Sequence, residues 1–87
     1  ITGGGIIGNT KRILPKGREL KIDWNSWKLP KIFSLIQKTG NIPDEEMRSV
    51  FNLGIGLVAV VSPKDVEKII KISKTIKEKA IVIGEVI

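Results

Sequence analysis

The stretch FNLGIGLVAVV, residues 51–61, decides the fold expected for this chain. Its first half carries Gly54 and Gly56, which permit a tight turn and let a ligand or another backbone approach closely. Its second half, Leu57 to Val61, is an unbroken apolar run of residues that favour strands. A short apolar run bounded by turn signals is typical of a strand buried on both faces. The stretch therefore predicts a buried strand over 57–61 that follows a glycine turn.

The segments on both sides predict elements that would cover this strand. Alternating apolar residues over 20–24 indicate a half-buried strand, and residues 80–87 read as a second buried strand. Three helices are expected: one from Pro30 to a stop at Gly40, one beginning near Asp44, and one that starts at Pro63 with Ser62 as its N-cap. Strand 57–61, the third helix and strand 80–87 could form a right-handed parallel unit. An antiparallel arrangement with an intervening strand is the alternative.

Length and composition indicate one small domain. Eighty-seven residues make at most a single domain, and no run approaches the roughly 20 apolar residues that cross a bilayer. The expected fold class is α/β (α+β), with a mixed β-sheet and helices packed on it. Because the chain has no initiator Met and opens inside a motif, we expect residues 1–87 to be a fragment or a single domain of a longer protein.

A second glycine-rich stretch, ITGGGIIG, occupies residues 1–8. Its glycines match the spacing GxGxxG, but a dinucleotide site of that type needs a preceding strand and a long crossover helix. Here Asn9 could cap a helix over residues 10–14, and Pro15 would end it after about one turn. Consecutive glycines before a helix still offer backbone N–H groups that suit a phosphate, and Arg12 could add a bidentate contact. The alternative is an ordinary glycine-rich loop.

Charge and the missing residue types limit the chemistry. The chain has no cysteine and no histidine, which removes thiol nucleophiles, Cys/His zinc sites and the commonest general base. The net charge of +6 comes mostly from lysines. Lysines spread along helices, with only two Phe, two Trp and no Tyr, favour a solvated surface over a nucleic-acid interface. Glu45 and Glu46 fall in the first turn of a helix, where the macrodipole explains them without catalysis.

A series of short motifs runs in order along the whole chain: ITGGG at 1–5, Asn9, RILP at 12–15, Ser26-Trp27, Pro30 with Ile32-Phe33, GNIP at 40–43, Glu45-Glu46-Met47, FNxGxG at 51–56, Ser62-Pro63 and IGEV at 83–86. This ordered set resembles roughly the last quarter of phosphoribosylformylglycinamidine cyclo-ligases, also called aminoimidazole ribonucleotide synthetases. The sequence departs from the family pattern at Lys11, where a proline is usual, and at Arg48-Ser49-Val50, which replaces Tyr-Arg-Thr. Because of the second departure, a role that the family assigns to that Tyr or Arg is not transferred to this chain.

The resemblance implies a cytoplasmic, homodimeric enzyme of purine synthesis that uses ATP and Mg²⁺. ATP would phosphorylate the formyl oxygen of formylglycinamidine ribonucleotide, and the amidine nitrogen would then close the imidazole ring with release of ADP and phosphate. An N-terminal domain outside this chain would supply much of the ATP site.

On this resemblance, a phosphate-bearing ligand would contact one group of residues, namely Thr2, Gly3, Gly4, Gly5, Asn9 and Arg12. Asn52, Gly54 and Gly56 would line the same cleft. The sequence names no catalytic base and no metal ligand. Two other functions stay open. One is another ATP-using member of the superfamily, such as a formylglycinamidine ribonucleotide synthase-like protein, and the other is a non-catalytic basic binding module.

Overall fold

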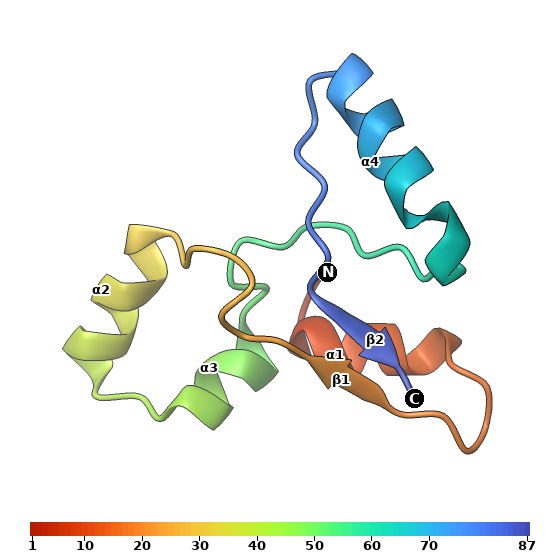
Figure 1. Cartoon of the computed structure of the whole chain (residues 1–87). Coiled ribbons are helices and arrows are strands. Elements are labelled where there is room, and N and C mark those ends of the chain that lie inside the picture. The colour runs from red at the N-terminus through yellow and green to blue at the C-terminus, as the bar shows by residue number, and fades with distance from the viewer.

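The computed structural model describes residues 1–87 and shows an α+β arrangement, as the sequence predicts. The elements along the chain are α1 (Gly5–Thr10), η1 (Lys11–Ile13), β1 (Leu20–Ile22), α2 (Lys31–Gly40), α3 (Asp44–Val50), η2 (Pro63–Asp65), α4 (Val66–Thr75) and β2 (Gly84–Val86). Figure 1 shows α2 at one side of the molecule, and α4 at the other side above α1 and the two strands. None of the helices has the length and apolar character that a membrane crossing requires.

The helix boundaries of the middle of the chain follow the sequence signals. Pro30 stands directly before α2, where its fixed φ suits entry into a helix. Gly40 is the last residue of α2, and Asn41 rather than the glycine adopts the left-handed conformation that ends it, with φ 49°. Helix α3 begins at Asp44 and carries three acidic residues in its first turn, next to the positive end of the helix dipole.

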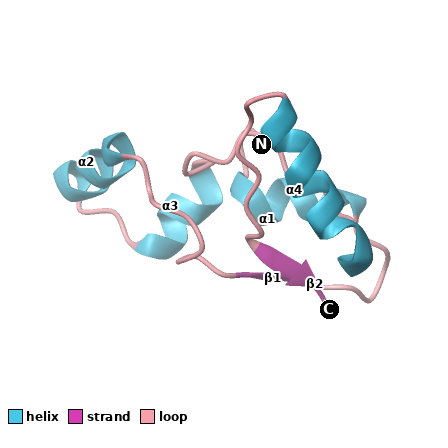
Figure 2. Cartoon of the chain, turned by 45° about the horizontal axis from the view of Figure 1, so that its top comes forward, coloured by secondary structure: helices cyan, strands magenta, loops and turns pink.

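The last helix, α4, is also predicted correctly, although its capping is not. Pro63 opens a 3₁₀ turn that continues into α4. The side chain of Ser62 makes no capping hydrogen bond, so the predicted N-cap interaction is wrong. Figure 1 shows α4 standing apart from the other helices, and Figure 2 shows the long loop that runs from the end of α4 to β2.

The sheet is smaller and simpler than expected. Strand β1 pairs antiparallel with β2, with Leu20 opposite Val86 and Ile22 opposite Gly84. Hydrogen bonds of Glu19 with Ile87, and from the N–H of Asp23 to the oxygen of Ile83, extend the ladder at both ends. The predicted mixed sheet and parallel unit are therefore wrong within these residues. The C-terminal strand pairs with the early strand 20–22, a long-range partner that no local pattern reveals.

The predicted central strand over 57–61 is also wrong. This segment is extended but forms no strand, and Leu57 has 89% of its surface exposed. Residues 80–83 similarly lie outside the strand that begins at Gly84. A strand needs a neighbouring backbone to satisfy its N–H and C=O groups. The 87 residues supply such a neighbour for β2 but not for segment 57–61, so all its residues except the half-buried Val58 are exposed.

The buried core is correspondingly small. Only five residues are buried, and the buried hydrophobic side chains are Ile6, Met47 and Leu53. The radius of gyration is 14.0 Å, whereas a compact chain of this length would have about 12 Å. The accessible surface is 6905 Å², against about 5100 Å² for a folded monomer of this mass. The chain thus leaves apolar surface uncovered over much of its length.

Candidate glycine-loop site

The loop Thr2–Gly5 is held together by the side chain of Asn9. The Nδ2 group of Asn9 donates to the carbonyl oxygens of Thr2, Gly3 and Gly5, at 3.3, 3.1 and 2.7 Å. The hydroxyl of Thr2 in turn donates to Asn9 Oδ1 at 3.2 Å. The sequence places Asn9 at a helix N-cap, but Asn9 lies inside α1, four residues after its start at Gly5. The glycines themselves begin the helix, and Asn9 fixes their carbonyls.

Two N–H groups of this loop have no hydrogen-bond partner in the chain. Neither the N–H of Gly3 nor that of Gly4 donates a hydrogen bond within the chain. Gly3 is exposed, and a Cβ placed on it would meet no atom within 4 Å. Gly4 has a φ of 101°, a conformation that favours glycine and turns the chain into α1. The loop therefore presents unpaired N–H donors beside the start of a helix, which is the backbone arrangement that suits an anionic group.

Gly5 anchors the loop to α3. It has a φ of 70°, and a Cβ there would lie 2.0 Å from the carbonyl oxygen of Arg48 and 3.4 Å from that of Phe51. Only a residue without a side chain allows this approach of two backbones. The position of the loop is therefore set by the C-terminal end of α3.

Arg12 lies away from the loop. It belongs to the exposed turn η1 at the other end of α1. Seven residues of helix separate it from Gly5, a rise of about 10 Å along the axis. The structure therefore places Arg12 at the end of α1 opposite to the backbone donors.

The second glycine segment lies next to the first. The backbone nitrogen of Ile1 donates to the carbonyl oxygen of Gly56 at 2.5 Å. Thr2 and Asn52 both line one open cavity of about 250 Å³, together with Ile1, Phe33, Val50 and Phe51. The structure thus brings Thr2 next to Asn52, and Ile1 next to Gly56.

Gly54 has a different part in this segment. Its φ is 94°, and a Cβ there would lie 2.7 Å from Cγ of Pro30. The N–H of Gly54 donates to Oδ1 of Asn52 at 2.9 Å, which closes the turn. Gly54 therefore packs on the start of α2 and shapes the turn, while Asn52 and Gly56 face the first loop.

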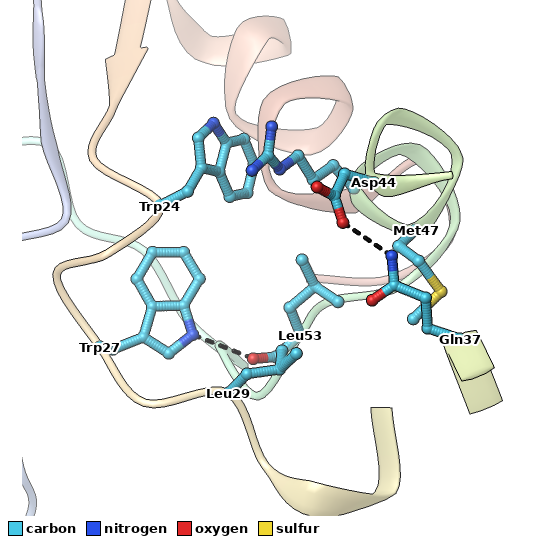
Figure 3. A pocket seen from close by; sticks show the side chains of 8 residues that line it. Trp24, Trp27, Leu29, Gln37, Asp44, Met47 and Leu53 are labelled. Atoms are coloured by element: carbon cyan, nitrogen blue, oxygen red, sulfur yellow. Dashed lines mark hydrogen bonds between the residues drawn. The ribbon is translucent and has the colours of Figure 1, made fainter. Parts of the chain in front are cut away.

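Trp27 contacts the same turn, and Trp24 packs beside Trp27. The indole N–H of Trp27 donates to the carbonyl oxygen of Leu53 at 3.0 Å. Trp24 lies with its ring centroid 5.9 Å from that of Trp27, and the guanidinium of Arg48 stacks 4.5 Å above Trp24. Figure 3 shows both indoles on one side of a small cavity, opposite Asp44 and the hydrogen-bonded amide of Gln37. Trp27 is thus a packing residue in this structure.

Ligands for a metal ion do not gather in this chain. No three Asp, Glu, His or Cys side chains lie close enough together to hold a metal ion. Glu45 and Glu46 are exposed in the first turn of α3, as expected from the dipole argument.

Comparison with known proteins identifies the family of this chain. The family model described as AIR synthase related protein, C-terminal domain, matches residues 1–87. The chain belongs to this family. A phosphoribosylformylglycinamidine cyclo-ligase of Thermoanaerobacter sp. (strain X514) is 52% identical over all 87 residues, which cover 26% of that protein.

Other relatives of the AIR synthase C-terminal family give the same result. The cyclo-ligases of Pseudothermotoga lettingae and Bacillus cytotoxicus are 46% and 44% identical over the whole chain, which covers 26% and 25% of those proteins. The chain thus spans about a quarter of the length of the relatives that it matches.

Sequence reasoning missed two features of the site. The first is the aromatic pair Phe33 and Phe51, whose ring centroids lie 5.8 Å apart beside Thr2 and Asn52. The two residues lie 18 positions apart in the sequence, so no local pattern pairs them. The second is the contact of Gly5 with the backbone of Arg48, because nothing in the sequence brings these two distant positions together. Only the packing of α1 against α3 makes these features visible.

Proposed function

We propose that this chain is the C-terminal part of an ATP-dependent phosphoribosylformylglycinamidine cyclo-ligase. The whole enzyme would convert formylglycinamidine ribonucleotide to aminoimidazole ribonucleotide in purine biosynthesis. The relatives of the AIR synthase C-terminal family carry that name and match the chain from end to end. The enzyme would act in the cytoplasm as a homodimer, as the resemblance of the ordered motifs implies.

The observation that carries the proposal is the loop of residues 2–5. Its unpaired N–H groups at Gly3 and Gly4 offer donors to phosphate oxygens, and Asn9 holds the loop carbonyls turned away from the ligand. Fixed donors of this kind stabilise charge that develops in a phosphoryl or acyl transition state without further reorganisation. We assign to this loop the binding and orientation of a phosphate-bearing substrate.

ATP would act as the substrate that makes the formyl oxygen a good leaving group. Its γ-phosphoryl group would pass to that oxygen, the amidine nitrogen would attack the activated carbon, and ADP and phosphate would leave. In this chain, the Thr2–Gly5 loop would hold the phosphate in position and Asn52 would flank the same cleft. Mg²⁺ would screen the phosphate charges, and we assign none of its ligands to these 87 residues.

The uncovered surface supports the idea that the chain works as part of a longer protein. Large apolar side chains are exposed on several elements, including Leu57, Ile76 and Val82. The excess over a compact monomer is about 1800 Å², which exceeds what one partner contributes to a standard protein interface. We propose that the remaining part of the enzyme covers this surface and supplies neighbours for segment 57–61.

A chimera tests this function directly. In it, the matching quarter of the Thermoanaerobacter relative is replaced by residues 1–87 of this chain. We expect the purified chimera to close the ring of formylglycinamidine ribonucleotide in the presence of ATP, with stoichiometric release of ADP. The chain alone should show no turnover, because it would contribute only part of the site.

The control is the same chimera with Gly5→Val, which should fold poorly and lose turnover. A chimera that is folded and dimeric but closes no ring would contradict the proposal. Turnover of formylglycinamide ribonucleotide instead, with an ammonia donor, would point to the synthase-like alternative.

A further inference from the structure

Arg48 is the residue of α3 that contacts both the glycine loop and the tryptophan pair. Its carbonyl oxygen is the atom closest to the position that a Cβ of Gly5 would occupy. Its guanidinium lies 4.5 Å from the centre of the Trp24 ring, in the only cation–π contact of the chain. The backbone and the side chain of one residue therefore connect two parts of the molecule that are distant in the sequence.

The carbonyl oxygen of Arg48 has no other partner. The N–H of Asn52 would pair with this oxygen if α3 continued, but α3 ends at Val50 and that hydrogen bond is not made. A helix leaves its last carbonyl groups without partners inside the helix. The hydrogen of Gly5 that a Cβ would replace therefore points at an oxygen with free lone pairs, as in a weak C–H···O contact.

Helix α3 depends on its surroundings to hold this oxygen in place. It has only seven residues, and isolated helices shorter than about 12 residues are marginal in water. Met47, with 3% of its surface exposed, anchors α3 on one side. On the other, Arg48 stacks on Trp24, which packs on Trp27, and Trp27 donates to the oxygen of Leu53. The stack thus fixes the last turn of α3 relative to the turn at residues 51–56.

We propose that Arg48, through its stack on Trp24, is a positioning residue for the Thr2–Gly5 loop. The inference rests on the proposed function of that loop in holding a phosphate. Arg48 contacts no substrate. It holds the carbonyl oxygen against which Gly5 rests, and it thereby sets the direction of the unpaired N–H groups of the loop. Because a Tyr is usual at this position of the family, the stack belongs to this chain and not to the family pattern.

Steady-state kinetics of the chimera with Arg48→Leu measures this role. A loop that holds the phosphate less firmly loses binding that is equal in the ground state and the transition state, so KM should rise while kcat stays unchanged. We expect KM for formylglycinamidine ribonucleotide or for ATP, whichever the loop holds, to rise about two- to fivefold, the range of a partly exposed cation–π contact. A purely structural role would reduce the folded fraction, and with it kcat, without changing KM. The matched control is Arg18→Leu, because Arg18 is an exposed arginine without an aromatic contact.

A double-mutant cycle with Trp24→Leu assigns the effect to the stack. Trp24→Leu should raise the same KM, and Arg48→Leu should have no further effect in that background. Hydrogen exchange gives a readout that needs no turnover. The N–H of Gly5 donates to the oxygen of Thr2 at 3.3 Å. It should exchange about two- to fivefold faster in Arg48→Leu than in Arg18→Leu, because the loop opens more often when the stack is lost.

Two results overturn the inference. In the first, Arg48→Leu leaves KM and the exchange of Gly5 unchanged, or lowers kcat alone. In the second, the effects of Arg48→Leu and Trp24→Leu on KM simply add, which means that the guanidinium acts without the indole. The proposed function is tested separately by turnover. An active chimera with unchanged KM keeps the function and removes Arg48 as a positioning residue, whereas an inactive chimera with faster exchange of Gly5 does the reverse.

Discussion

Replacing Gly5 with alanine tests the contact on which the candidate site depends. The new Cβ would lie 2.0 Å from the carbonyl oxygen of Arg48 and 3.1 Å from its carbonyl carbon. These are backbone atoms of α3, so they cannot rotate away as the end of a flexible side chain would. The φ of 70° also holds the alanine in the left-handed region. That conformation costs a residue with a side chain about 1–2 kcal/mol.

The total effect on stability follows from these two terms. Overpacking against fixed atoms costs about 1–3 kcal/mol, so we expect Gly5→Ala to lower the free energy of unfolding by about 2–5 kcal/mol. That is a large fraction of the 5–15 kcal/mol typical of a folded domain. The matched control is Gly3→Ala, two residues away in the same loop, where a Cβ meets no atom within 4 Å. We expect a change of less than about 0.5 kcal/mol there.

Urea unfolding of the chimera and of its two variants, followed by circular dichroism, measures the difference. The midpoint should fall for Gly5→Ala and stay in place for Gly3→Ala. If the two alanines had the same effect, large or small, the close approach of the loop to Arg48 would not be what fixes the loop, and the reasoning would fail.

Three further predictions follow from the same geometry. Gly54→Val should lower the melting temperature far more than Lys71→Ala, because the valine meets Pro30 at a φ of 94° and the lysine is exposed; equal melting temperatures would refute this. Asn9→Asp should cost about 1–3 kcal/mol by removing the amide hydrogens that hold the loop carbonyls, and hydrogen exchange over residues 2–10 should accelerate; unchanged exchange would show that Asn9 does not hold the loop. Leu57→Ser should leave the free energy of unfolding of the isolated chain unchanged, because Leu57 is 89% exposed there. It should lower the stability of the chimera by about 1.5–3 kcal/mol, because the rest of the enzyme would bury this side chain. Equal effects in urea unfolding of both proteins would contradict the proposed covering of segment 57–61.

Most of the helices can be predicted from the sequence, because their signals are local. Proline fixes φ at the entry to α2, three acidic residues start α3 at Asp44, and apolar residues at helical spacing define α4. The strand over 20–22 is equally local in its alternation. The positive φ of Gly54 can also be expected from the sequence, because two glycines close together beside an apolar run indicate a tight turn.

How these elements pack against one another depends on contacts between distant residues. The apolar run 57–61 has every residue preference of a strand, yet it remains unpaired, because a strand is stabilised by a neighbouring backbone that the run cannot encode. The pairing of β1 with β2, the approach of Gly5 to Arg48, and the groove that joins Phe33 to Thr2 and Asn52 all bring distant residues together. Local preferences act over a few residues, whereas these contacts arise only when packing closes long loops, and the candidate site is made of such contacts.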